Sequence, residues 1–335
     1  MGHNSLKAIF FFTVLASVWW LVGCGKSSQD VATHQAKRGY KIVVTTGMVA
    51  DIVRHVAGDH AEVIGLMAEG VDPHLYTPNR NDTVYMMEAD VIFYSGLHLE
   101  GHMQESFERH REAGKPVFAV TEGLEKSFLR NPSEFEGYPD PHVWMDVTAW
   151  SLCVTEVAKQ LSTYDKEHAT EYQRNAKEYQ KELEQLDEYI KRIIKTIPKK
   201  QRVLVTAHDA FGYFGRAYQI SVRSVQGIST ESEPSLDDIT SLVDFVVEQK
   251  VPAIFIESSV PQRSVQAIQE GVREKGGRIA LGGSLFSDAM GATGTYEGTY
   301  IGMLDHNATL IVHALGGTAP TKGFQKKLEI ALQQN

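Results

Sequence analysis

Cysteine is scarce in this chain of 335 residues, in which only Cys24 and Cys153 occur. Two cysteines exclude the dense disulfide framework that stabilises many small secreted domains. Cys153 lies in an amphipathic segment, and its one available partner ends an N-terminal apolar run, so we expect a free buried thiol. The folded part of the chain must therefore rely on hydrophobic cores, which a content of 42% apolar residues permits.

Positive charge is also in short supply, because 33 basic residues stand against 42 acidic ones and the formal net charge is −9. This balance argues against a nucleic-acid partner, since no basic stripe is left over to neutralise phosphates. Internal repeats at the periods of solenoid proteins are absent from the sequence. The length of the chain favours two domains over one.

The N-terminal apolar run from Ala8 to Val22 is short for a spanning helix, which needs about 20 apolar residues. It fits the hydrophobic part of a secretory signal, although Lys7 is the only lysine or arginine before it. The run ends in "LVGC" at Cys24, which resembles the bacterial lipobox, whose cysteine is lipidated. We expect a lipoprotein signal peptide over 1–23 and a flexible tether over 24–39, with an uncleaved anchor as the alternative.

Strand-like and helix-like segments alternate after this tether. We expect strands at 40–46, 61–67, 91–94 and 115–120, and again at 202–207, 220–225, 253–258 and 278–283. Such alternation predicts an α/β fold of two lobes, each a mainly parallel sheet flanked by helices. The lobes are expected at 40–165 and 199–335.

The segment between the lobes, 166–198, has no glycine and no proline before Pro198. Its apolar residues recur at helical spacing, at Leu183, Leu186, Ile190, Ile193 and Ile194. This spacing predicts one long, rigid connecting helix with a narrow buried stripe.

The tripeptide Asp-Pro-His occurs twice, at 72–74 and 140–142, each time beyond a predicted strand. The proline fixes its own φ near −65° and restricts the aspartate before it, so a stiff backbone presents each imidazole. We expect Asp72 and Asp140 to accept hydrogen bonds from nearby backbone N–H groups, and a contact with the imidazoles is the less favoured alternative. One such tripeptide is explained by ordinary turn chemistry, but two copies favour metal ligands at His74 and His142.

Two further polar side chains, His208 and Asp288, follow predicted strands of the second lobe. In open α/β sheets, ligands bind beyond the carboxyl ends of the strands. The four side chains, two from each lobe, are therefore candidates to meet in a cleft between the lobes. Three imidazoles and one carboxylate suit Zn²⁺, Mn²⁺ and Fe²⁺.

Six segments of the chain resemble, in family order, the zinc- and manganese-binding solute receptors of ABC transporters, cluster A-I: "EGVDPHLYTP", "GLHLE", "DPHVWMDV", "VLVTAHDAFGYFGRAY", "AIFIESS" and "LFSDAMG". The resemblance extends from about Tyr40 to Leu315. It implies a monomeric receptor, not an enzyme, that is lipid-anchored at Cys24 on the extracytoplasmic face of a membrane. It also implies that His74, His142, His208 and Asp288 hold Zn²⁺ or Mn²⁺ as cargo for an ABC-type permease.

The chain departs from both specialised branches of this family. Streptococcal-type manganese receptors have glutamate at the position of His208, whereas dedicated zinc receptors usually carry a loop rich in histidine and acidic residues before the second ligand. The corresponding residues here, 111–139, contain no histidine. Zn²⁺ is expected to bind the nitrogen-rich site more tightly than Mn²⁺, which does not identify the physiological cargo.

Other candidate residues and functions have simpler interpretations. His98 and His102 have i, i+4 spacing, but the glutamate of the zincin motif does not follow His98, so we expect a solvated helix face. Glu257 ends a predicted strand and is a candidate to orient a ligand imidazole or to cap the next helix. A metallohydrolase is disfavoured because four protein ligands close the position that catalytic zinc keeps open for water. A surface adhesin is a third class, and no segment identifies a host ligand.

Overall fold

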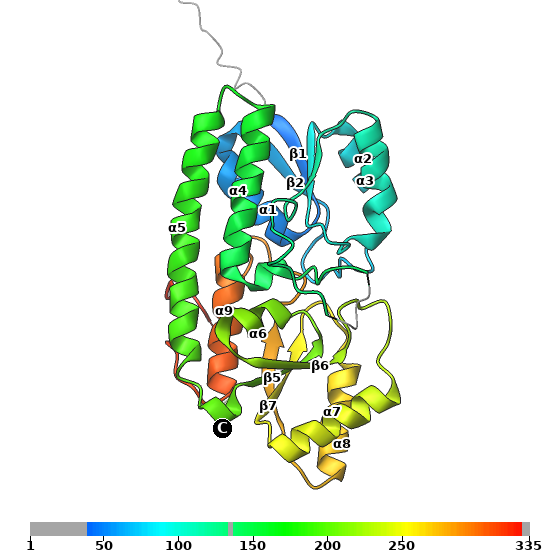
Figure 1. Ribbon diagram of the computed structural model, residues 1–335, viewed down its shortest axis with the longest axis vertical. Helices are drawn as coiled ribbons and strands as arrows, with labels where there is room; N and C mark the ends of the chain where they lie inside the picture. The colour runs from blue at the N-terminus through cyan, green and yellow to red at the C-terminus, as the bar shows by residue number, and fades with distance from the viewer. Residues whose placement is uncertain (1–38, 133–136, 330–335) are drawn as a thin grey trace, which may run out of the picture. The chain divides into compact units, whose positions relative to one another are not determined.

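The N-terminal lobe is built on a parallel sheet of four strands in the order β2-β1-β3-β4 (Figure 1). The computed structural model describes residues 39–132 and 137–329. The strands are β1 (Tyr40–Val44), β2 (Ala61–Gly65), β3 (Val91–Tyr94) and β4 (Val117–Ala119). The strands expected at 40–46, 61–67 and 115–120 are shorter in the structure, although the N–H groups of Leu66 and Met67 still donate to the carbonyls of Val44 and Thr45 beyond the end of β2. The central strands are apolar on both faces because helices cover both sides of the sheet.

The two faces of this sheet contact different helices. Ile42, Val44 and Phe93 face α1 (Gly47–Ala57), α4 (Val147–Tyr164) and α5 (Ala169–Ile194). Val43 and Ile92 point the other way, toward Met86 of α2 (Arg80–Glu88) and Phe107 of α3 (Gln104–Glu112). Successive side chains of a strand point to opposite faces of the sheet, so alternate residues pack into two different hydrophobic cores.

Local sequence sets where these helices begin. Thr46 caps α1 by accepting the N–H of Val49, and Asp146 caps α4 by accepting the N–H groups of Thr148 and Ala149. Asn79 and Asp82 form a reciprocal capping box at the start of α2. Asp146 is four residues beyond His142, so the cap also fixes where the second Asp-Pro-His loop ends.

The C-terminal lobe contains two parallel strand pairs. β5 (Val203–His208) pairs with β6 (Ser221–Gln226), β7 (Ala253–Glu257) pairs with β8 (Ala280–Leu285), and β5 contacts β7. The helices are α6 (Gly212–Tyr218), α7 (Leu236–Gln249), α8 (Arg263–Glu274) and α9 (Tyr300–Ala314). Short 3-10 segments complete the described elements at Gly58–His60, Gly101–Met103, Val143–Met145 and Lys199–Gln201. Every strand pair in the described residues is parallel, which confirms the expected fold class.

The connecting helix α5 begins at Ala169 and ends at Ile194, within the expected range of 166–198. Its buried stripe includes Leu183, Leu186 and Ile190, as predicted. Alongside α5 run α4 and, from the C-terminal lobe, α9 (Figure 1). One hydrophobic core consequently extends from Val44 through Ile190 to Leu304, so the lobes share packed side chains as well as a connecting helix.

The expected signal peptide, most of the expected tether and Cys24 lie outside the described residues. Among the helices that the structure does describe, none combines the length and the apolar content needed to cross a membrane. The other cysteine, Cys153, is a free and fully buried thiol on α4, as expected.

Candidate metal-binding site

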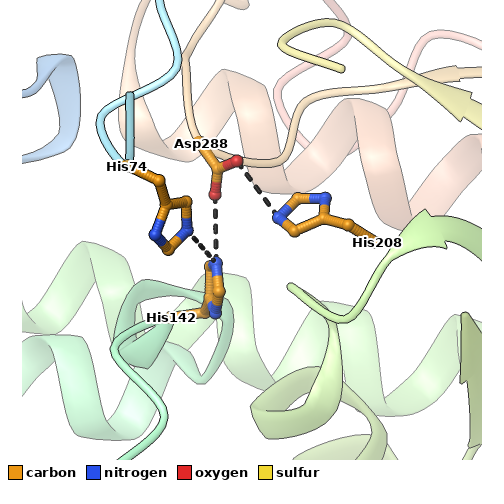
Figure 2. Close-up of side chains that lie close together, drawn as sticks. All are labelled: His74, His142, His208 and Asp288. Atoms are coloured by element: carbon orange, nitrogen blue, oxygen red, sulfur yellow. Dashed lines mark hydrogen bonds and ion pairs between the residues drawn. The ribbon is translucent and has the colours of Figure 1, made fainter. Parts of the chain in front are cut away.

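The four side chains singled out from the sequence meet in one place (Figure 2). His74 lies in the loop after β2, His142 directly precedes the 3-10 segment Val143–Met145, and Asp288 lies in the loop after β8. His208 is the last residue of β5, which ends one residue beyond the expected strand at 202–207. All four side chains are buried, and one ligand atom from each lies within 4.8 Å of the others.

The distances between these donor atoms match the ligands of a single ion. Nε2 of His74 lies 3.3 Å from Nε2 of His142. The Asp288 carboxylate lies 3.2 Å from Nε2 of His142 and 3.1 Å from Nε2 of His208. Nitrogen and oxygen ligands at about 2.0–2.1 Å from a tetrahedral ion are separated from one another by roughly 3.3 Å. The spacing therefore suits a metal centre.

Two atoms of the cluster lack hydrogen-bond partners among the described residues. Nε2 of His208 and Oδ1 of Asp288 are buried, and neither makes a hydrogen bond of good geometry, although each lies close to an oppositely charged group. A buried polar atom without a partner is destabilising, and such atoms are rare in folded proteins. A bound cation would satisfy both atoms at once.

The first Asp-Pro-His loop is fixed by its aspartate. Oδ1 of Asp72 accepts the backbone N–H of His74 at 2.9 Å, as expected for the turn. Oδ2 accepts the hydroxyl of Thr230, in the C-terminal lobe, at 2.6 Å. Burial lowers the pKa of His74 to about 3, so this imidazole is neutral, which is the form that binds a metal.

In the second Asp-Pro-His loop, the aspartate also holds the imidazole. Oδ1 of Asp140 accepts the backbone N–H of His142 at 3.0 Å and lies 2.9 Å from Nδ1 of the same residue. The other carboxylate oxygen pairs with the Arg130 guanidinium, and the Tyr213 hydroxyl donates to the Asp140 carbonyl at 3.0 Å. This contact of Asp140 with the imidazole is the alternative that the sequence disfavoured. Arg130 and Tyr213 were not candidates, because nothing in their spacing relates them to His142.

His208 has a similar carboxylate partner. Oε1 of Glu257 accepts the backbone N–H of His208 at 2.8 Å, and Oε2 pairs with Nδ1 of its ring. Glu257 is the last residue of β7, whereas α8 begins at Arg263 without a side-chain cap. Glu257 thus contacts a candidate ligand and does not cap the next helix.

The charges of the cluster reinforce one another. Burial alone would lower the pKa of His142, but Asp140 and Asp288 outweigh it and raise the pKa to about 9. Burial is likewise outweighed at His208, where Glu257 and Asp288 raise the pKa well above its usual value. Burial would raise the pKa of Asp288, yet the imidazoles of His208 and His142 hold it well below its usual range. The carboxylate therefore carries the negative charge that attracts a divalent cation.

His98 and His102 do not form the expected helix face. His98 has a left-handed backbone with a φ of 68°, and Gly96 and Leu97 before it also have positive φ values, which no α-helix tolerates. The ring of His98 stacks on Tyr138 with 4.2 Å between centroids. His102 lies in the 3-10 segment Gly101–Met103, with Nε2 3.5 Å from Glu231. Neither histidine belongs to the four-residue cluster.

Comparison with known proteins gives close matches over most of the chain. The family described as zinc-uptake complex component A, periplasmic (ZnuA), matches residues 42–314. The manganese-binding lipoprotein MntA of Bacillus subtilis is 44% identical over 302 residues, which are 90% of this chain and 97% of MntA. The zinc-binding protein TroA of Treponema pallidum is 46% identical over 289 residues, covering 86% and 92%. The solved structure of TroA superposes with a TM-score of 0.80 at 45% identity, covering 83% of this chain and 99% of TroA.

These matches confirm the resemblance drawn from the sequence motifs, which are especially similar to the treponemal receptor. They also confirm the fold of two α/β lobes with a linking helix. The matched family consists of solute-binding proteins and not of enzymes, as expected, and its description places its members outside the cytoplasm. The chain therefore belongs to the ZnuA family, the metal-binding solute receptors of ABC transporters.

Proposed function

We propose that this receptor captures one Zn²⁺ or Mn²⁺ ion with His74, His142, His208 and Asp288 and delivers it to the permease of an ABC importer. The convergence of four buried donors from both lobes carries the proposal. Three imidazoles and a carboxylate are ligands that both ions accept. With four protein ligands around the ion, the site is built to hold a metal and not to activate water on it.

The carboxylates behind the imidazoles support this assignment. Asp140 lies on Nδ1 of His142, and Glu257 lies on Nδ1 of His208, so that Nε2 of each ring faces the centre of the cluster. Metal-binding histidines almost always donate their second N–H to such a partner, which fixes the ring orientation and strengthens the ligand. We assign this role to both carboxylates.

The relative affinity of the site for zinc and manganese follows from its three nitrogen donors and one carboxylate. One similar relative is named for manganese and another for zinc, at nearly equal identity to this chain. Affinity at nitrogen-rich sites rises from Mn²⁺ toward Zn²⁺. We therefore propose that the site accepts both ions and holds Zn²⁺ more tightly.

The anchor and the organisation of the chain complete the proposal. We propose that residues 1–23 are removed, that Cys24 is lipidated, and that 24–39 tether the receptor to the membrane. MntA, a similar relative, is itself named a lipoprotein. We propose that the lobes at 40–165 and 199–335, with the connecting helix at 166–198, act as a monomer that docks on the permease.

Replacement of Asp288 tests the ligand set. Asp288→Ala removes the only carboxylate among the four donors and should weaken Zn²⁺ binding by more than about 100-fold, since even partners of ligands contribute 10–100-fold. Asp237→Ala, on the exposed start of α7, is the matched control and should bind as the wild type does. Competition titration with a chelator measures both affinities and the stoichiometry. Two tight ions per wild-type chain, or full affinity in Asp288→Ala, would refute the proposal.

A further inference from the structure

Trp144 joins the loops of two ligands that come from different lobes. It lies two residues after His142, in the 3-10 segment Val143–Met145, and its side chain is fully buried. Its indole Nε1–H donates to the carbonyl oxygen of Ser287 at 2.9 Å, and Ser287 directly precedes Asp288. One side chain thus links the backbone next to Asp288 with the backbone next to His142.

The backbone of Trp144 is itself fixed by several helices. The Tyr300 hydroxyl, at the start of α9, donates to the Trp144 carbonyl at 2.7 Å. The backbone N–H of Tyr300 donates to Asp51 of α1 at 3.2 Å, and Asp51 also accepts the hydroxyl of Tyr179 from α5. Trp144 therefore lies in the core that the lobes share, and this chain of hydrogen bonds connects it to α1, α5 and α9.

The loop of Asp288 is held from both sides. In its own lobe, Asn307 of α9 accepts the N–H of Phe286 at 2.9 Å and donates to the carbonyl of Phe286 at 2.7 Å. From the other lobe, Trp144 holds the next residue, Ser287. The indole also packs edge-on against the His142 ring, with 5.2 Å between centroids and 63° between planes. The distance of 3.2 Å between the Asp288 carboxylate and His142 Nε2 is thus set by neighbouring contacts.

We propose that Trp144 is a positioning residue for the bound metal. Through its hydrogen bond to Ser287, it sets where the Asp288 carboxylate lies relative to His142, and so it governs the affinity and coordination geometry of the ion. The inference rests on the proposed function, since it takes His142 and Asp288 as ligands. The physical reason is preorganisation: two loops from different lobes that are already fixed lose less freedom when the ion binds.

Trp150 offers a matched comparison. It is also fully buried, it belongs to the same core, and its ring lies 6.4 Å from that of Trp144. Its Nε1–H, however, makes no hydrogen bond within the described residues. Replacing either tryptophan with phenylalanine removes a similar apolar volume, but only Trp144→Phe removes a hydrogen bond to the loop of Asp288.

The test compares Trp144→Phe with Trp150→Phe. Affinities for Zn²⁺ and Mn²⁺ are measured by competition titration, and the visible absorption of bound Co²⁺ reports the geometry of the ligands around the ion. Trp144→Phe should weaken Zn²⁺ binding by about tenfold, the lower bound for residues that hold ligands, and should alter the Co²⁺ spectrum. Trp150→Phe should keep the wild-type spectrum and affinity, even if it unfolds at a lower temperature.

Three results would overturn the inference: wild-type affinity and spectrum in Trp144→Phe, equal changes in both variants, or a change in Trp150→Phe alone. If Trp144→Phe does not fold, Tyr300→Phe tests the same contact chain, because it removes the hydroxyl bound to the Trp144 carbonyl and keeps the ring. An unchanged Co²⁺ spectrum in Tyr300→Phe then counts against the inference, and an altered one supports it. Asp288→Ala distinguishes a failure of the proposed ligand set from a failure of the role proposed for Trp144. Full metal affinity in Asp288→Ala refutes the ligand set. Lost affinity in Asp288→Ala, together with wild-type binding in Trp144→Phe, refutes only the role of Trp144.

Discussion

Thr230 donates its hydroxyl hydrogen to Asp72 across the boundary between the lobes, at a distance of 2.6 Å. Asp72 is the residue that holds the backbone of His74, so a side chain of the C-terminal lobe stabilises a ligand loop of the N-terminal lobe. Trp144 does the reverse, from the N-terminal lobe to the loop of Asp288. Each lobe thus helps to place a ligand that belongs to the other.

Thr230→Val is the first prediction. Valine keeps the shape of the side chain but leaves one oxygen of a largely buried carboxylate without its partner, which costs about 1–2 kcal/mol. We expect a lower free energy of unfolding and several-fold weaker Zn²⁺ binding, measured by thermal unfolding and competition titration. Thr240→Val is the control, because the Thr240 hydroxyl is exposed and donates only to Leu236 within α7. Equal effects of the two substitutions would show that the contact with Asp72 contributes nothing specific.

The second prediction concerns His208 and metal choice. A carboxylate offers one or two oxygens and suits Mn²⁺, whereas imidazole suits tetrahedral Zn²⁺. His208→Glu should therefore lower the ratio of Zn²⁺ to Mn²⁺ affinity. Glu257 now pairs with Nδ1 of His208, and a second carboxylate in that place would repel it. The double variant His208→Glu with Glu257→Gln should consequently bind Mn²⁺ better than His208→Glu alone. An unchanged ratio in both variants would count against His208 as a ligand.

The third prediction is that protons and metal compete. In the metal-free site, the pKa of His142 is raised to about 9, and that of His208 is raised well above its usual value. Both groups hold a proton below those pKa values, and imidazole must lose it to bind a metal. Affinity should therefore fall as the pH is lowered from about 9, and binding near pH 7 should release protons. Calorimetry in buffers of different ionisation enthalpy measures the release, and equal apparent heats in all buffers would contradict it.

The fourth prediction is that metal removal does not open the lobes widely. Hinges need a few residues that absorb φ/ψ changes, and α5 has no glycine or proline within it. The core that runs from Val44 to Leu304 adds a second restraint, because wide opening would expose it. Small-angle scattering should give the same radius of gyration with and without Zn²⁺. A clear increase after chelation would show that the shared core separates.

The residues of the site were predictable because their signals are local. Each Asp-Pro-His tripeptide stiffens its own loop, and the strand ends at His208 and near Asp288 are visible in the apolar pattern. The surrounding contacts were not predictable in the same way. Arg130 reaches Asp140, and Thr230 reaches Asp72, only because loops that are distant in the sequence pack together.

Local backbone geometry explains why the helix face expected at His98 and His102 is wrong. The spacing of His98 and His102 is helical, but residues 96–98 have positive φ values that no apolar pattern reveals. Glu257 illustrates the opposite case, since two roles were open from the sequence and the packing of β7 beside β5 places its carboxylate on His208. Fold class follows from periodicity, whereas the partners of a ligand follow from packing.

The buried thiol of Cys153 has a consequence for a receptor that works outside the cytoplasm. A cysteine side chain binds soft metals and exchanges with disulfides as the thiolate, which forms only when the thiol loses its proton. Burial raises the pKa of Cys153 far above neutral pH, and the side chain has no exposed surface. The Cys153 thiol is therefore unreactive in the folded lobes. An incoming zinc ion meets no thiolate trap there, and an oxidant finds no thiol through which to cross-link two receptors.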